Sequence, residues 1–206
     1  ALAALPPQPV AAADMRRHVR GGRPGAVVVG SHVSKTTRQL QRLLEEPDTA
    51  PIEVDVARLP DQDRQLLANV LERIEAAHAR RLTAVIFTSR TEMTFADEQT
   101  RLAFGEMVSA FLMKVVHRLP ADIGFLISKG GITSNDVLSQ GLSLRTARVL
   151  GQILPGCSVV RCPEDHPQYP DMPVVIFPGN VGDDQALATV FRRLAGPVNA
   201  DHLKSG

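Results

Sequence analysis

Short runs of apolar, mostly β-branched residues recur along the chain, and each run ends in glycine or in polar residues. Runs of this kind are typical of fully buried strands in parallel sheets. The strands predicted from these runs span residues 26–29, 83–87, 123–127 and 174–177, and a further strand is predicted at 52–56, where apolar and polar residues alternate. A hairpin is also predicted, with strands at 145–154 and 158–161 joined by Pro155-Gly156, because Pro-Gly is a strong turn signal.

Between these runs, apolar residues recur every three or four positions, which predicts amphipathic helices. The predicted helices span residues 10–20, 35–46, 61–80, 97–118 and 183–194, and a further helix begins near Thr133. Strands that alternate with helices indicate βαβ units. We therefore expect an α/β fold: a three-layer sandwich with a mainly parallel, mixed sheet, a late antiparallel hairpin and helices on both faces.

The clearest candidate for chemistry follows the strand predicted at 123–127, where Gly130-Gly131 is followed by Thr133 and Ser134. Paired glycines let backbone N–H groups approach an anion, and the N-terminus of the helix adds partial positive charge. The turn therefore predicts a phosphate site. The alternative is a plain structural turn, because many α/β proteins pass from strand to helix through two glycines without binding a ligand.

Two further turns share this chemistry: Gly30-Ser31 and the run Phe177-Pro-Gly-Asn-Val-Gly-Asp183. Ligands of open α/β sheets bind beyond the carboxyl ends of the strands. If the three turns lie side by side, they form one phosphate site, which we call the cradle. The predicted phosphate contacts are Ser31, Gly130, Gly131, Thr133, Ser134, Gly179, Asn180, Val181 and Gly182.

Two common nucleotide motifs are absent. The run from Gly30 to Thr36 is one residue short of the P-loop pattern and has Ser34 where the second glycine belongs, so Ser34 is expected to be a helix N-cap. No G-x-G-x-x-G follows a predicted strand. His32 and His166, in predicted loops, are weaker candidates for ligand contact.

Three aspartates follow the glycine-rich turns, namely Asp136, Asp183 and Asp184. Aspartates in such places can bind Mg²⁺ through water, but carboxylates in a first helical turn also interact favourably with the helix dipole. Neither role is favoured by the sequence, and no direct metal ligand is predicted.

Composition narrows the class of protein. The 206 residues suffice for one large domain or two small ones, and a net charge of +1 gives no basic surface for nucleic acid or an anionic membrane. We therefore expect neither partner. The two cysteines, Cys157 and Cys162, lack the spacing of a zinc site, which favours a reduced, cytoplasmic protein.

The chain divides into three parts by composition. Residues 1–24 are expected to form a linker-like segment with a short helix, because the first nine are rich in alanine and proline. Residues 25–196 form the predicted α/β domain, and 197–206 a tail.

Four motifs, in order, resemble one family. They are G-S-H-V-S-K-T-T-R-Q-L from Gly30, S-K-G-G-I-T-S-N-D from Ser128, L-P-G-C from Leu154 and F-P-G-N-V-G-D from Phe177. The set covers nearly the whole chain and is similar to the C-terminal nucleotide-binding domain of the four-carbon acid sugar kinases. One departure concerns Phe177-Pro178-Gly179, where many members have Lys-Ser-Gly, so a lysine contact to phosphate is not carried over.

The resemblance implies an ATP-dependent kinase, with ATP and Mg²⁺ as cofactors, that phosphorylates the 4-hydroxyl of a 3-oxo-tetronate, threonate or erythronate. In that family an N-terminal domain with an Asp-Asp-x-Thr-Gly opening binds the sugar acid, and this sequence contains no such opening. We therefore expect this chain to be the C-terminal half of a larger polypeptide. Alone, it should bind ATP or ADP without catalysing the reaction. A homodimer is compatible with this expectation.

The Lys-Gly-Gly-Ile-Thr-Ser stretch also resembles a branch found in fusion proteins with other sugar-processing enzymes, so the substrate stays open. Two other classes of function remain as alternatives. One is a non-catalytic domain that senses a phosphosugar or a nucleotide, and the other is a structural α/β module that docks onto a partner enzyme.

Overall fold

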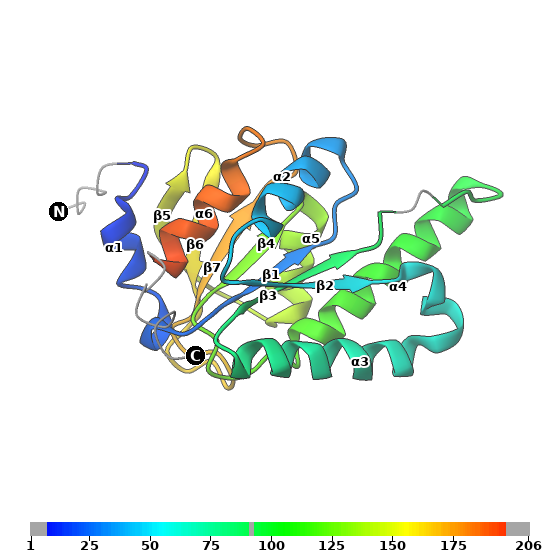
Figure 1. Ribbon diagram of the computed structural model, residues 1–206, viewed down its shortest axis with the longest axis horizontal. Coiled ribbons are helices and arrows are strands. Elements are labelled where there is room, and N and C mark those ends of the chain that lie inside the picture. The colour runs from blue at the N-terminus through cyan, green and yellow to red at the C-terminus, as the bar shows by residue number, and fades with distance from the viewer. Residues whose placement is uncertain (1–7, 91–92, 197–206) are drawn as a thin grey trace.

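A seven-stranded sheet forms the centre of the computed structural model, which describes residues 8–90 and 93–196 (Figure 1). The strand order is β2-β3-β1-β4-β7-β6-β5. The first five strands in this order are parallel, whereas β6 is antiparallel to both β7 and β5. The strands are β1 (Ala26–Val29), β2 (Thr49–Val54), β3 (Thr83–Thr88), β4 (Leu126–Lys129), β5 (Arg148–Leu154), β6 (Cys157–Arg161) and β7 (Pro173–Phe177).

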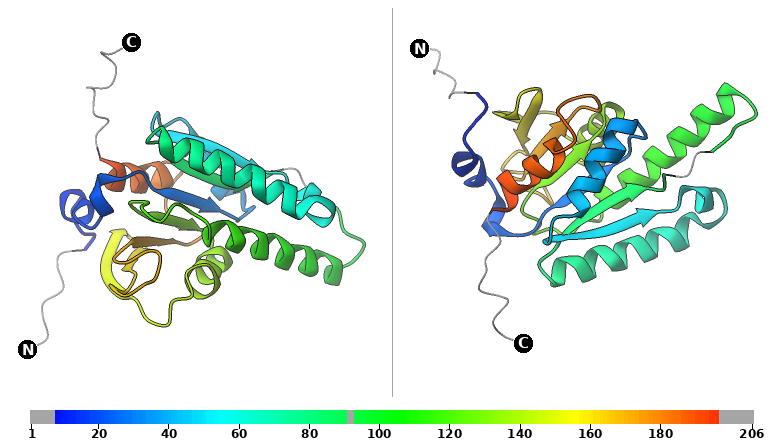
Figure 2. Two further views of the ribbon diagram at one scale, coloured as in Figure 1. Left: turned by 90° about the horizontal axis from the view of Figure 1, so that it is seen from below. Right: turned by 45° about the horizontal axis from the view of Figure 1, so that its top comes forward.

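Helices cover both faces of this sheet, and the predicted three-layer α/β fold with a late antiparallel hairpin is confirmed. Figure 2 shows α3 beside α4 in one view and α2 beside α6 in the other. The helices are α1 (Ala12–Arg16), α2 (Ser34–Leu44), α3 (Leu59–Ala79), α4 (Glu98–Val116), α5 (Gly131–Asp136) and α6 (Ala186–Ala195). Short helical turns lie at Arg20–Gly22 and Val56–Arg58, and α5 continues into a π-helical turn, Val137–Gly141.

Alternate side chains of each central strand enter two separate cores. In β1, Ala26 and Val28 pack into the core beneath α3 and α4, whereas Val27 and Val29 face α1, α2 and α6. All four side chains are buried. This double burial explains why the parallel strands appear in the sequence as continuous apolar runs.

The fourth strand of the chain begins three residues later than predicted. Gly124 pairs with the segment before β1 and not with the sheet: its N–H donates to Pro24 O (2.8 Å), and its carbonyl accepts from the Arg20 N–H (3.0 Å). The first bond to β1 is that of the Ala26 N–H to Phe125 O (3.0 Å). The ladder with β1 then runs from Leu126 to Lys129. Two polar residues that were predicted to belong to the turn are therefore part of a buried strand.

Two other local expectations differ from the structure. The strand predicted at 52–56 is β2, Thr49–Val54, and it ends where the Asp55 carboxylate accepts the Ala57 N–H (3.2 Å) and starts a helical turn. Ser34 is the first residue of α2 and not its N-cap; Val33 occupies the cap position, and no side chain caps the helix there.

The described part of the N-terminal segment packs against the domain. The Val10 N–H donates to Gln152 O in β5 (2.8 Å), and Met15 of α1 is fully buried in the core with α6. A linker role for residues 1–24 stays a prediction, and the expected tail, 197–206, lies outside the described residues. Within those residues, no helix combines the length and the apolar character needed to cross a membrane.

Candidate functional site

Three turns meet at the carboxyl edge of the parallel strands, because β1, β4 and β7 are neighbours in the sheet. A Cβ placed on Gly130 would lie 3.1 Å from Ser31 Cβ, and one on Gly30 would lie 2.5 Å from Thr133 Oγ1. A Cβ on Gly179 would lie 3.8 Å from Ser31 Oγ. The three parts of the cradle are therefore adjacent, although nucleotide contact by each residue stays a prediction.

Gly130 shapes the first turn through its backbone. Its φ of 124° lies in a region that favours glycine, and its N–H donates to Phe177 O (2.9 Å), which joins the turn to β7. Next to it, no atom lies within 4 Å of the place where a Cβ of Gly131 would be. The start of α5 is therefore open, and the N–H groups of its first turn have no partner within the helix.

The hydroxyl groups at the cradle differ in their availability. Ser31 Oγ accepts from the Val33 N–H and from Thr36 Oγ1, both at 3.4 Å, so its own proton can be donated to a ligand. Ser134 is buried, and its hydroxyl donates to Ser128 O (3.0 Å). Ser134 thus supports the turn from inside, whereas Ser31 is the better placed of the two for a ligand.

The second glycine-rich turn, residues 178–182, is held by side chains from elsewhere. Four consecutive carbonyl groups accept hydrogen bonds: Lys129 Nζ donates to Pro178 O (2.7 Å) and Gly179 O (3.1 Å), Lys35 Nζ to Asn180 O (3.2 Å), and Gln39 Nε2 to Val181 O (3.0 Å). Gln39 also donates to Asp183 O (2.6 Å).

This pattern of carbonyl bonds orients the amides of the same turn. A trans peptide places its N–H opposite its C=O. The N–H groups of residues 179–182 therefore point away from the side chains that hold the carbonyls. The N–H groups of Gly179, Asn180 and Gly182 donate to no protein acceptor in the parts of the chain that the structure describes. Residues 179 and 180 form a tight turn that directs the Val181 N–H toward Pro178 O. The free amides form a concave site of the kind that binds anions.

Cations without acidic partners surround the cradle. Arg90, in the loop after β3, donates from Nη1 to Ser31 O (2.5 Å), and its buried Nε and Nη2 have no partner among the described residues. No ion pair of the described ranges includes Lys35, Arg90 or Lys129. Glu53 acts on Arg90 through space and tends to raise its pKa, although burial lowers that pKa overall. Lys35 and Lys129 therefore carry most of the positive charge that no acidic side chain balances at the cradle.

The two histidine candidates lie at opposite ends of the parallel strands: His32 follows β1, and His166 precedes β7. His32 is at the cradle, where its Nε2 lies 3.0 Å from Thr88 Oγ1; burial and the nearby Arg90 lower the pKa of His32, so it is neutral at pH 7. His166 lies in the loop before β7, where its Nδ1 accepts the Tyr169 N–H (2.9 Å) and its Nε2 lies 2.9 Å from Leu142 O. The expectation that His166 lies near the site is wrong, and its contacts are those of a structural residue.

The three aspartates do not converge on one metal site. The Asp136 carboxylate accepts from Ser109 Oγ and from Gln140, and both oxygens of Asp184 accept from Arg38 (2.9 and 3.1 Å). Within the described residues, the Asp183 carboxylate accepts only the Gln185 N–H, through Oδ1 (3.0 Å). Among the described residues no group of three or more potential metal ligands occurs. Asp183 alone fits a water-mediated contact to a magnesium ion held by phosphates.

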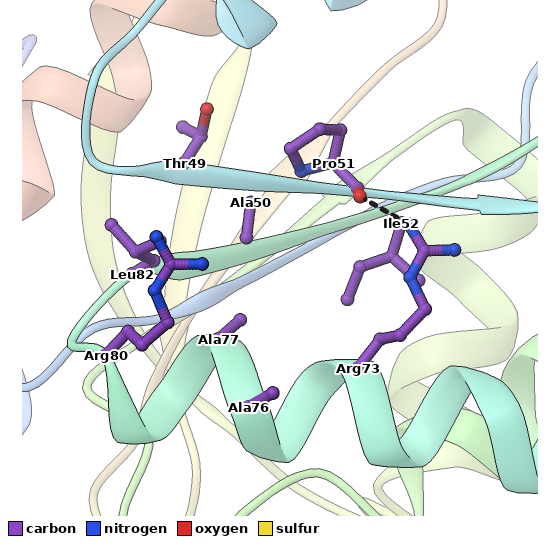
Figure 3. A pocket seen from close by; sticks show the side chains of 9 residues that line it. All are labelled: Thr49, Ala50, Pro51, Ile52, Arg73, Ala76, Ala77, Arg80 and Leu82. Carbon is purple, nitrogen blue, oxygen red and sulfur yellow. Dashed lines mark hydrogen bonds between the residues drawn. The ribbon is translucent and has the colours of Figure 1, made fainter.

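A pocket of about 430 Å³ lies elsewhere, between the edge strand β2 and the C-terminal half of α3 (Figure 3). Arg73 borders it and donates to Pro51 O (2.8 Å). No cradle residue lines this pocket, whose lining combines small apolar side chains with Arg73 and Arg80.

Sequence reasoning missed four cradle side chains: Lys35, Gln39, Arg90 and Lys129. The sequence did contain a sign of the role of Gln39. It lies on the buried face of α2 with Thr36, Leu40 and Leu43, where a polar side chain needs a hydrogen-bond partner. The sequence also contained a sign of the role of Lys129, because this residue directly precedes the glycine pair. The partners of both depend on strand order, which the sequence does not show.

Free amides and unbalanced cations at the carboxyl edge of a parallel sheet define an anion-binding α/β domain. A family model described as the nucleotide-binding C-terminal domain matches residues 26–187. The chain belongs to this family, which confirms the family expected from its motifs.

Solved structures with the same fold include a domain of unknown function from Bordetella bronchiseptica with bound citrate, a domain-swapped dimer. It has a TM-score of 0.66 and 18% identity over 84% of this chain and 41% of that chain. A putative tRNA synthase from Salmonella typhimurium has a TM-score of 0.62 and 20% identity over 85% and 41%. The chain thus spans less than half the length of these proteins. No curated protein matches.

Proposed function

We propose that this chain is the ATP-binding half of a kinase that phosphorylates the 4-hydroxyl of a four-carbon acid sugar, a 3-oxo-tetronate, threonate or erythronate. The observation that carries the proposal is the cradle: free amides from two glycine-rich turns, ringed by Lys35, Arg90 and Lys129, in a member of a nucleotide-binding family. The four ordered sequence motifs support the kinase class.

In this proposal the chain contributes positioning and positive charge, which are the main requirements of phosphoryl transfer. The free amides of the 178–182 turn and that of Gly131 would hold the phosphate oxygens, and Ser31 and Thr133 would add hydroxyl contacts. Bound Mg²⁺ would neutralise charge on the phosphates, with Asp183 oriented toward its water shell. Arg90 and Lys129 would stabilise the remaining negative charge from behind the two turns.

The sugar acid and the group that takes its proton are assigned to a further domain. The solved structures that share this fold are more than twice as long as the part matched here, which supports a second domain in the parent protein. We accordingly expect the isolated chain to bind ATP and ADP without turnover. The domain-swapped dimer of the Bordetella protein supports a homodimer as part of the same proposal.

Calorimetric titration of the chain with ADP, with and without Mg²⁺, tests the proposal directly. A four-carbon sugar-acid phosphate serves as the competing ligand. We expect ADP binding that Mg²⁺ strengthens and no heat with the sugar phosphate. Preference for the sugar phosphate would indicate the sensing class instead, and a folded protein that binds neither would indicate the structural class.

A further inference from the structure

Lys129 is the only lysine or arginine that is fully buried in the described residues. It is the last residue of β4, and its side chain faces the core beneath α2 and α6 together with its neighbour in the ladder, Phe177. Its Nζ lies 4.1 Å from the centre of the Phe177 ring. The ammonium donates to Pro178 O and Gly179 O and to no carboxylate.

Burial of this charge opposes folding. An ammonium transferred from water to a protein interior loses hydration that carbonyl groups and an aromatic ring replace only in part. A methionine at this position would pack beside Phe177 without that cost. The structure therefore keeps a costly buried charge, and its hydrogen bonds to Pro178 O and Gly179 O offset that cost only in part.

The position of the ammonium has a consequence for the cradle. Because Lys129 holds the carbonyls of Pro178 and Gly179, the N–H groups of Gly179 and Asn180 face the opposite side of the turn. Lys35 and Gln39 continue the same arrangement at the next two carbonyls. Lys129 thus holds the first two of the four carbonyls, at the point where the turn leaves β7.

We propose that Lys129 is a positioning residue for the bound phosphate chain: its ammonium sets the orientation of the amides of Gly179 and Asn180 and supplies the charge that the anion balances. The proposal rests on the proposed nucleotide function and deepens it. In the free protein the charge is uncompensated, and in the complex the phosphates compensate it across the turn.

The protonation of Lys129 makes the proposal measurable. Burial lowers the pKa of Lys129 to about 8; among the titratable groups that face it, Cys157 of β6 acts to raise the pKa and Lys35 of α2 to lower it. Burial raises the pKa of Cys157 itself to about 11, so this thiol stays neutral through the range in which Lys129 titrates. A bound anion favours the ammonium, so nucleotide affinity should fall as the pH rises through 8.

The stability of the free protein should increase with pH, in the opposite direction to its nucleotide affinity. The folded-state pKa of Lys129 lies below the model value of 10.5, so the unfolded chain binds the proton more tightly. The cost of the buried charge is fully present below pH 8 and decreases between pH 8 and 10.5. The free energy of unfolding of the free protein should therefore rise with pH over the same interval in which nucleotide affinity falls.

The experiment compares the wild-type chain with Lys129→Met, and with Lys114→Met as a matched control. Lys114 lies on α4, where its Nζ pairs with Asp63 (2.7 Å) away from the cradle. ADP affinity would be measured by calorimetry from about pH 6.5 to about pH 9.5, a range that spans the lowered pKa. The melting temperature of each free protein would be recorded at each pH.

We expect Lys129→Met to weaken ADP binding at pH 7 by about tenfold or more, as for loss of a charge-assisted hydrogen bond. Its affinity should be flat with pH where the wild-type affinity falls. Its melting temperature should show the balance between the removed buried charge and the two carbonyls left without their donor. Lys114→Met should leave affinity unchanged. A lysine with only a structural role would leave no pH dependence of affinity.

Failure of the inference is distinguishable from failure of the proposed function. If the wild type does not bind ADP, the nucleotide function itself is wrong. If the wild type binds ADP and Lys129→Met binds it equally well at every pH, the role of Lys129 is wrong and the function stands. Should the variant not fold, a wild-type affinity that stays constant above pH 8 would overturn the inference.

Discussion

The two glycine-rich turns of the cradle lie side by side but are built in different ways. Gly130-Gly131 takes its shape from its own backbone, through the positive φ of Gly130 and a hydrogen bond to Phe177 O. The turn at 178–182 takes its shape from side chains that bind its carbonyls. Two of these, Lys35 and Gln39, come from a helix more than 140 positions earlier in the chain.

Two anion-binding turns of the same kind can therefore obtain their shape from different parts of the sequence. One depends on residues within the turn, and the other on side chains far from it in the sequence. A local turn should respond to substitutions within it, with little effect on the rest of the fold. A turn held from outside should respond to substitutions of its remote partners as well. Four variants test this difference, and they follow in the order of their expected effect on nucleotide affinity.

Gly131→Asp should have the largest effect. The new carboxylate would lie at the open start of α5, where it would repel phosphate, and like charges placed together cost several kcal/mol, or on the order of 100-fold in affinity. The melting temperature should hardly change, since the space is open and an acidic residue suits a helix N-terminus. Gly131→Ala is the matched control, and ADP titration of both variants separates charge from size; equal binding by both would remove Gly131 from the site.

Gly182→Ala should weaken ADP binding by about tenfold, because a distorted turn loses well-placed amide hydrogen bonds. Its φ of 77° disfavours any side chain, and the new Cβ would lie 2.3 Å from Ala186 Cβ at the start of α6. In contrast to Gly131→Asp, the melting temperature should fall as well. Gly105→Ala, at an open position in α4, is the control and should be slightly more stable with unchanged affinity; unchanged affinity in Gly182→Ala would exclude its turn from the site.

Gln39→Leu should weaken ADP binding several-fold although the residue touches no ligand in the proposal. The change removes the donor to Val181 O and Asp183 O, and because both bonds are only partly buried, their loss should cost no more than about 1 kcal/mol each. Thermal unfolding and ADP titration would be compared with Gln41→Leu, an exposed position on the same helix. If both variants behave alike, the 178–182 turn is not held from α2.

Lys35→Met should have the smallest effect, about twofold in affinity, because its bond to Asn180 O is long and exposed and such contacts contribute little. Affinity measured at low and high salt would show the loss decreasing as salt screens the charge. A loss as large as that expected for Lys129→Met would mean that the exposed lysine, and not the buried one, supplies the charge.

Much of the fold followed from the sequence, because the central parallel strands β1, β3, β4 and β7 are buried on both faces and appear as apolar runs. The glycine pair, the second glycine-rich turn and Pro155-Gly156 were also recognisable, since glycine permits and proline fixes the backbone angles that turns need. Their adjacency was a hypothesis, and it holds because β1, β4 and β7 are neighbours.

The parts that could not be predicted depend on contacts across the sheet. Ser128 and Lys129 looked like turn residues because polar side chains rarely end a buried strand, yet both pair with β1 and β7. His166 was a candidate for ligand contact because it lies in a loop. That loop follows β6, which runs antiparallel to β7, and it therefore lies at the end of the sheet opposite the cradle. Asp136 was expected to face the turn and instead accepts a hydrogen bond from Ser109 of α4.

The strand order also bears on how the domain folds. The seventh strand in the chain lies between β6, which directly precedes it in the sequence, and β4, with which it pairs from Leu126↔Val174 to Lys129↔Phe177 across a long segment of chain. Such pairings join residues far apart in sequence and are slow to form, because the intervening chain must be ordered first. The turn after β7 is thus completed late, and a chain in which only β1 to β4 have paired would present half of an anion site.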